Sequence, residues 1–280
     1  MYTFVERQYL KTRNMKRIAI LFLLVIIAFN TFSQEENLQF KLDSIVKEAD
    51  LLYRYEKVAW NSSDLFMLDS KLKINYGGYL IFQSNDTIFA TFNDKSQKEK
   101  IAKYYFTNAD VNFPFKTEVE VSALTKTEQE LLNIKTKIIN QIYDKKYEVT
   151  IPQGFNPNIE LIKEKDGYKL YMIMGTPEPG IIPFGNDYLF RADLEGNIIG
   201  SKKFHSRMIP ALSKGPNGEV VVSAIHSHLK TTPYITATDI CTFRLYGGLC
   251  KMDEFKVLCT ATGKYYKYSI KTNKIEVTKP

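Results

Sequence analysis

The chain has 280 residues, 44% hydrophobic and 13% aromatic, a composition that supports a packed core and excludes a disordered chain. It carries 38 lysines and arginines against 31 aspartates and glutamates, and a basic excess of this kind favours a nucleic-acid partner. Most of the excess lies in residues 1–33, without which the balance is 33 basic to 30 acidic residues. We therefore expect no nucleic-acid partner.

Residues 15–33 have the three parts of a secretory signal peptide: two basic residues, the apolar run 18–29, and small side chains before Gln34. The run is short for a membrane span, so we expect cleavage before Gln34, no membrane span afterwards, and a periplasmic or secreted protein. An uncleaved N-terminal anchor is the alternative. Residues 1–14 are interpreted as an extension upstream of the true start at Met15.

Residues 34–150 are predicted to form an α+β region of unknown role. Apolar residues recur every three or four positions across 36–60, which predicts a helix with one buried face. Two β-rich runs within 79–92 predict a hairpin, and the capping-box pattern at 125–128 predicts that a second helix begins there. No catalytic constellation is evident in this region, and no internal repeat is evident in the chain.

Residues 151–280 are predicted to consist of short strands and one helix. The elements are strands at 169–174 and 219–228, a proline-rich loop at 176–185, hairpins at 188–205 and 255–270, and a helix at 236–248. This order predicts an α+β fold, with a mixed or antiparallel sheet and flanking helices.

Cysteine is scarce and late in the chain: Cys241, Cys250 and Cys259. No CxxC pair is present, which argues against a zinc ribbon or a thioredoxin-like site. Export permits a disulfide, but three cysteines leave one unpaired, and we favour small buried thiols over a disulfide.

Two of the chain's three histidines, His226 and His228, lie two residues apart at the end of a predicted strand. Because alternate side chains of a strand point the same way, both imidazoles can reach one metal ion. The ten-residue loop that follows allows Asp239 to return from the first turn of a helix. Two histidines and one aspartate leave one tetrahedral position open, which is typical of a catalytic zinc whose bound water has a pKa of about 7.

The same segment has a structural interpretation. Thr236 to Asp239 has the pattern of a capping box with aspartate in place of glutamate, so Thr236 would cap the helix and Asp239 would favour its positive end. This interpretation leaves the histidine pair unexplained, because two imidazoles on one buried face are costly without a partner. The spacing favours a metal site, and the capping role stays open.

His226-Ser227-His228, followed after seven residues by Thr236 and after two more by Asp239, resembles the signature of JAMM metalloproteases, also called JAB or MPN-type domains. The family has serine where this chain has Thr236. The order of predicted elements across residues 185–272, roughly a third of the chain, is similar to that of bacterial RadC-like and toxin-associated JAB domains. The resemblance implies a JAB-like fold for residues 151–280.

The resemblance also implies roles for single residues. His226, His228 and Asp239 match the zinc ligands of the family. Thr236 matches the serine whose hydroxyl helps to stabilise the oxyanion in peptide hydrolysis, and threonine keeps the hydroxyl. The family's catalytic glutamate falls near Asp187, whose carboxylate is one methylene shorter but can act as a general base.

Three further residues bear on this resemblance. Leu229 stands where many members have proline, a departure that alters the loop after the histidines. Glu178, on the proline-rich loop, is the alternative base. His205 ends a predicted strand and has three interpretations: a third nitrogen ligand in place of Asp239, a substrate-binding group, or an ordinary surface histidine. We favour the last.

These observations predict an exported, zinc-dependent hydrolase that cleaves a peptide or isopeptide bond in a peptide or protein substrate. One alternative is a catalytically weak or inactive binding module with the same fold. Another is a two-histidine-one-carboxylate site that holds a redox metal such as iron. The oligomeric state is not predicted.

Overall fold

The computed structural model describes residues 37–144 and 147–279, and the predicted signal peptide lies outside these ranges. The chain forms two compact units, residues 1–45 and 46–280. The described part of the first unit, residues 37–45, is helical. Within the described ranges, no helix is long and apolar enough to cross a membrane.

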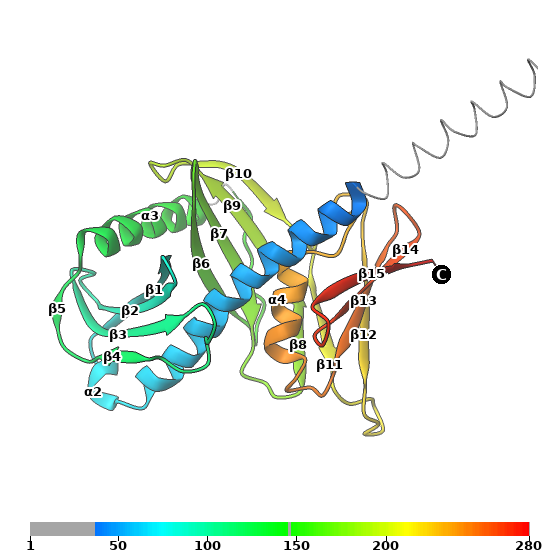
Figure 1. Cartoon of the computed structure of the whole chain (residues 1–280), viewed down its shortest axis with the longest axis horizontal. Coiled ribbons are helices and arrows are strands. Elements are labelled where there is room, and N and C mark those ends of the chain that lie inside the picture. The colour runs from blue at the N-terminus through cyan, green and yellow to red at the C-terminus, as the bar shows by residue number, and fades with distance from the viewer. Residues whose placement is uncertain (1–36, 145–146, 280) are drawn as a thin grey trace, which may run out of the picture. The chain divides into compact units, whose positions relative to one another are not determined.

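The first sheet follows the helical residues 46–67 and the short helix α2 (Ser70–Lys73). Its strands are β1 (Tyr76–Ser84), β2 (Thr87–Asp94), β3 (Glu99–Thr107), β4 (Lys116–Glu118) and β5 (Ser122–Ala123). The order is β1-β2-β3-β4, all antiparallel, with β5 paired to β3 (Figure 1). Asn85 takes a positive φ of 52° in the tight turn between β1 and β2, which confirms the predicted hairpin.

The second sheet follows helix α3 (Lys126–Tyr143). Its strands are β6 (Asn156–Glu164), β7 (Gly167–Gly175), β9 (Tyr188–Ala192) and β10 (Ile198–Lys203), in the order β10-β9-β7-β6. The capping box of Thr125 and Glu128 confirms the predicted start of α3. A helix followed by an antiparallel meander therefore occurs twice, an internal repeat of structure that the sequence pattern does not reveal.

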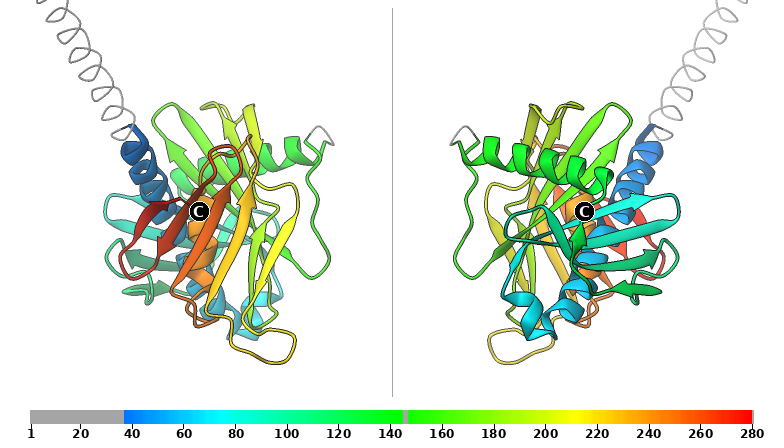
Figure 2. Two further views of the ribbon diagram at one scale, coloured as in Figure 1. Left: turned by 90° about the vertical axis from the view of Figure 1, so that its right-hand side faces the viewer. Right: turned by 90° about the vertical axis from the view of Figure 1, so that its left-hand side faces the viewer.

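The third part of the unit carries a short ribbon and a four-stranded sheet. The ribbon pairs β8 (Ile181–Gly185) with β11 (Met208–Leu212), so the predicted loop at 176–185 is wrong in its second half. The sheet has the order β12 (Ser223–His228), β13 (Glu254–Cys259), β14 (Lys264–Ser269) and β15 (Lys274–Thr278). The four strands are seen together in the left view of Figure 2.

Helix α4 (Ala237–Tyr246) connects β12 to β13, which run parallel, whereas the other pairs of this sheet are antiparallel. A parallel pair needs a crossover connection, and α4 supplies it. The helix is buried along most of its length, and the Phe243 ring stacks on Phe184 and packs against Phe255. The predicted α+β fold with mixed sheets and flanking helices is thus confirmed.

One hydrophobic core cluster lies between α3 and the second sheet. Leu131, Ile138 and Ile142 of α3 pack in one cluster with Leu170 and other residues from the same face of β7. The α3 side chains recur at helical spacing and the β7 side chains at every second residue, as the two periodicities require. Burial of each such side chain contributes about 1.5–3 kcal/mol. On the other face of β7, where Tyr171 and Ile173 are buried, Lys169 pairs with Glu48 of the first helix.

Candidate metal centre

The two histidines of β12 share one buried face of the strand, as predicted. His226 is 8% exposed and His228 is 1% exposed, whereas Ile225 and Ser227, on the other face of the strand, are exposed. The His226 ring packs against the rings of Phe184 and Phe255, with centroids 5.0 and 6.1 Å away. The strand therefore fixes both imidazoles against the core, with their Nε2 atoms 3.1 Å apart.

Asp239 reaches the histidines from the first turn of α4. The capping box is present: Thr236 Oγ1 accepts a hydrogen bond from the Asp239 amide at 3.1 Å, and Asp239 Oδ2 accepts from the Thr236 amide at 2.8 Å. Thr236 Oγ1 also donates to Asp239 Oδ2 at 2.6 Å. The structural interpretation of Thr236 is thus confirmed, but only Oδ2 takes part in the cap, and Oδ1 is left free for another role.

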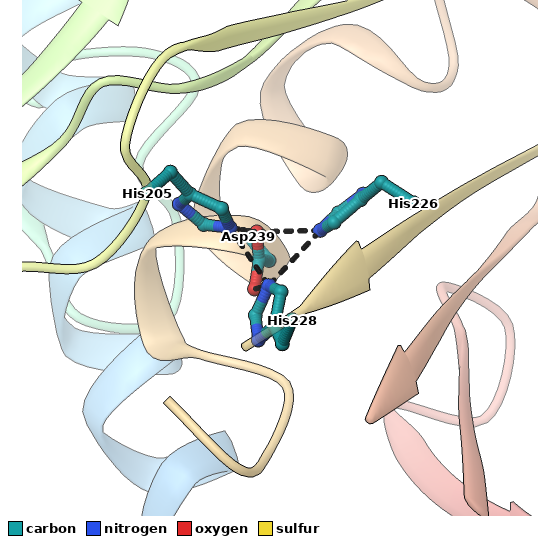
Figure 3. Close-up of side chains that lie close together, drawn as sticks. All are labelled: His205, His226, His228 and Asp239. Atoms are coloured by element: carbon teal, nitrogen blue, oxygen red, sulfur yellow. Dashed lines mark hydrogen bonds and ion pairs between the residues drawn. The ribbon is translucent and has the colours of Figure 1, made fainter. Parts of the chain in front are cut away.

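His205 is the third histidine at this point, and its interpretation as a surface residue is wrong. It follows β10, is 5% exposed, and places Nε2 2.7 Å from Nε2 of His228. The same atom lies 3.3 Å from Asp239 Oδ1. Where the sequence predicts three ligands and an open position, the structure brings four candidate donors together: His205, His226, His228 and Asp239, here called the His₃Asp group (Figure 3).

The spacing of these donors fits one metal ion. One ligand atom from each residue lies within 4.8 Å of all the others. Nε2 of His226 is 3.3 Å from Asp239 Oδ1, and Nε2 of His228 is 3.4 Å from Oδ2. A tetrahedral zinc with bonds of about 2.0–2.1 Å separates its donors by about 3.3 Å. The two nitrogen pairs, at 2.7 and 3.1 Å, are somewhat closer than this.

The hydrogen bonds of the far ring nitrogens show what the group requires. Nδ1 of His228 donates to the Tyr234 carbonyl at 2.6 Å, and Nδ1 of His205 donates to Asp187 Oδ1 at 2.6 Å. A neutral imidazole that carries its proton on Nδ1 presents a lone pair at Nε2. Two such lone pairs, 2.7 Å apart, repel each other unless a cation lies between them.

Asp239 Oδ1 adds a fourth electron-rich atom, since it is buried and has no hydrogen-bond partner. A buried unpartnered carboxylate oxygen is unusual and calls for a counterion. One proton can bridge only one donor pair of the His₃Asp group, whereas one metal ion can satisfy all four donors. The donor chemistry of the group therefore fits a metal ion.

The electrostatics of the group follow from the same contacts. Burial lowers the pKa of His205, but the carboxylates of Asp187 and Asp239 outweigh it and raise the pKa to about 11. Burial lowers the pKa of His228, and the neighbouring imidazoles lower it further. The three imidazoles hold the pKa of Asp239 well below its usual range in spite of burial. The group thus strongly favours the presence of positive charge.

Asp187 lies at this centre too, but behind His205. One of its oxygens accepts from His205 Nδ1, and the other accepts from the Thr238 hydroxyl. With both oxygens engaged, the geometry favours a positioning role, in which a carboxylate orients a metal-binding imidazole. Its predicted role as a general base stays a prediction that this arrangement does not favour.

The turn before Asp187 explains how its side chain is held. Gly185 has φ 88°, and a Cβ there would lie 2.3 Å from the Arg207 carbonyl, so only glycine fits without a shift. Asn186 has φ 52°, donates its backbone N–H to the same carbonyl, and donates its amide to the Thr150 carbonyl at 2.7 Å. The backbone that precedes Asp187 is therefore held in place by Gly185 and Asn186, which orients the Asp187 side chain.

Glu178, the alternative base, lies elsewhere. It is exposed and lines a cavity with Trp60 and Tyr246, at the other end of α4 from Asp239. A different cavity, of about 240 Å³, lies beside the His₃Asp group and is lined by His205, His228 and their neighbours.

The three cysteines are buried free thiols, as favoured from the sequence.

The sequence assigned His226, His228 and Asp239 by local spacing but missed the placement of His205. One signal in the sequence could have identified His205 as a ligand. The chain has three histidines, and once two of them are assigned to a metal, His205 is the one remaining imidazole. The hydrogen bond between Asp187 and His205 joins two loops, and no regular spacing in the sequence predicts it.

The comparisons with known proteins add little. No family model and no curated protein matches the chain. A crystal structure of a DUF2874 family protein from Bacteroides ovatus matches 52% of this chain and 85% of its own, with 11% identity and a TM-score of 0.16. A superposition this poor supports no statement about fold or function. The resemblance to JAMM domains therefore stays a prediction.

Proposed function

We propose that this chain is an exported zinc-binding protein in which one ion, held by the His₃Asp group, joins the second sheet to the C-terminal sheet. The observation that carries the proposal is the convergence of three Nε2 atoms on the buried carboxylate of Asp239, whose Oδ1 has no hydrogen-bond partner. Export is supported by the signal-peptide pattern of residues 15–33.

The donor set supports zinc. Imidazole nitrogen and carboxylate oxygen are donors that zinc binds well, and a four-donor group of this spacing suits its tetrahedral preference. Copper, nickel and iron also bind imidazole, so a redox metal is an outcome that metal analysis can distinguish.

The burial of the group supports a structural role. The side chains of His205, His226, His228 and Asp239 are 3% exposed or less, and structural zinc sites are closed by four protein donors. His205 follows a strand of the second sheet, whereas the other three ligands come from β12 and α4. A bound ion would therefore connect elements of two separate sheets.

A hydrolase is the second candidate, favoured by the cavity of about 240 Å³ beside His205 and His228. Zinc, when bound, would supply a Lewis acid for cleavage of a peptide or isopeptide bond. In this chain Asp187 would orient His205, and Thr236 would hold Asp239 through the cap. Hydrolysis requires in addition that substrate reaches the metal from the cavity, past a fully enclosed set of ligands.

The test is the metal content of the purified mature chain. We expect about one zinc per chain in the native protein and in Ser227→Ala, a control that changes the exposed residue between the two histidines. Replacing His226 and His228 by alanine should abolish zinc binding. Zinc retained by that double variant would contradict the proposal. A chelator that lowers thermal stability supports the structural role, and zinc-dependent cleavage of a peptide library supports the hydrolase.

A further inference from the structure

A second cluster of buried ionisable side chains lies between the two repeats, away from the metal centre. The first strands of the repeats, β1 and β6, lie next to each other, yet among the described residues no hydrogen-bond ladder joins them. A cavity of about 210 Å³ lies between residues 76–79 of β1 and the Pro157–Ile159 stretch of β6. Another, of about 430 Å³, lies between residues 80–85 and 161–163. We call this contact the β1–β6 seam.

Lys135 of α3 lies in the seam. Its ammonium donates to the Tyr79 carbonyl of β1 at 3.2 Å and lies 4.6 Å from the centre of the Tyr79 ring. The residue is 7% exposed and lines the smaller cavity. In a continuous sheet, the Tyr79 carbonyl on the edge strand β1 would accept a hydrogen bond from a neighbouring strand. Here it accepts one from Lys135 instead.

Two buried carboxylates act electrostatically on this lysine without forming an ion pair with it. Glu160 of β6 is fully buried and accepts from the Tyr79 hydroxyl at 3.2 Å. Glu56 of the first helix is 1% exposed and accepts from the Asn158 amide at 2.9 Å. One oxygen of each carboxylate, Glu56 Oε1 and Glu160 Oε2, is buried without a hydrogen-bond partner.

The charges of this cluster do not balance when all three groups are ionised. Two carboxylates and one ammonium leave one negative charge in the interior, and a buried uncompensated charge is strongly destabilising. One added proton, on either carboxylate, makes the cluster neutral. The other ionisable groups that act on these carboxylates (Tyr55, Tyr79, Cys241, Tyr246) are uncharged at neutral pH and cannot supply the missing positive charge.

We propose that Lys135, Glu56 and Glu160 form a pH-responsive latch, which closes the β1–β6 seam while the two carboxylates hold one proton and loosens it when that proton passes to solvent. Loosening would expose the facing edges of β1 and β6 and open the two cavities toward each other.

The acid–base properties of the three groups support this proposal. Burial raises the pKa of Glu160 to about 7, against the opposing charge of Lys135. Burial and the nearby Glu160 raise the pKa of Glu56 well above its usual range, and burial lowers the pKa of Lys135. A carboxyl whose pKa is raised in the folded state stabilises the fold at low pH. That stability is lost as the pH rises from the unfolded value, 4.5, through about 7.

The experiment compares the mature, metal-loaded chain with Glu160→Gln, which keeps the shape of the side chain but cannot ionise. Urea unfolding is measured at about pH 5 and about pH 8. We expect the unfolding constant of the native chain to rise by on the order of a hundredfold relative to that of Glu160→Gln between these conditions. Glu195→Gln, an exposed change on the loop after β9, is the control and should follow the native chain.

Hydrogen exchange locates the effect. After correction for intrinsic rates, β1 and β6 should exchange faster at the higher pH in the native chain and not in Glu160→Gln. Parallel pH dependence of the native chain and the variant, or faster exchange spread evenly over the sheets, would overturn the latch. Should Glu160→Gln fail to fold, Glu56→Gln tests the same proton. Zinc content, measured on the same samples, is expected to be unchanged, so failure of the latch is distinct from failure of the metal site.

Discussion

Replacement of Asp187 by asparagine tests how the metal centre is held. Asp187 Oδ1 lies 2.6 Å from His205 Nδ1, and the two side chains are 4% and 3% exposed. The contact is therefore short and shielded from water, and it keeps the proton on Nδ1 so that Nε2 faces the other donors. An asparagine amide is a weaker acceptor, and its NH₂ group can favour the tautomer with the proton on Nε2.

The expected effect is a loss of zinc affinity. Removal of a carboxylate behind a metal-binding histidine typically costs 10–100-fold in affinity. Because this contact is buried, we expect a value near the upper end, about 100-fold or about 2.8 kcal/mol. Competition with a chromophoric chelator measures the affinity, and Asp166→Asn, an exposed change in the turn between β6 and β7, is the control. Native affinity in Asp187→Asn would refute the positioning role.

Three other outcomes follow from the same contacts. His205→Ala should weaken zinc binding as strongly as His226→Ala in the competition titration. A small loss of affinity in His205→Ala would show that His205 is not a zinc ligand. Thr236→Ala should lower the free energy of unfolding in urea by about 0.5–2 kcal/mol through loss of the cap, and Thr236→Ser should keep it; equal stability of both variants would exclude the cap. Zinc at a hundredfold excess over its dissociation constant should raise the free energy of unfolding by about 2.7 kcal/mol. Calorimetry with and without chelator measures this, and an unchanged melting temperature would show that the folded state does not bind zinc.

The part of the centre that could be predicted from the sequence is the part with local spacing. His226 and His228 are two residues apart on one strand, and Asp239 belongs to a capping box, so strand and helix periodicity place them. His205 and Asp187 come from loops after β10 and before β9, and only the tertiary fold brings them to the same point. No periodicity links residues on separate loops.

The fold shows the same limit. The hairpin at Asn85 and the helix that begins after Thr125 were predicted because their turn and cap residues are local signals. The repeat of a helix and a meander was missed, since the two copies share an arrangement and not a sequence pattern. The buried pair of Glu56 and Glu160 was also missed, because carboxylates 104 positions apart in the sequence meet only across the seam.

Anomalous X-ray diffraction at the zinc edge, on crystals of the purified mature chain, would locate the ion that the His₃Asp group is proposed to hold. We expect one peak per chain, about 2.0–2.1 Å from Nε2 of His205, His226 and His228 and at a similar distance from an oxygen of Asp239. A chain without a peak at this position, or with its zinc bound at the cysteines, would contradict the assignment of the metal centre.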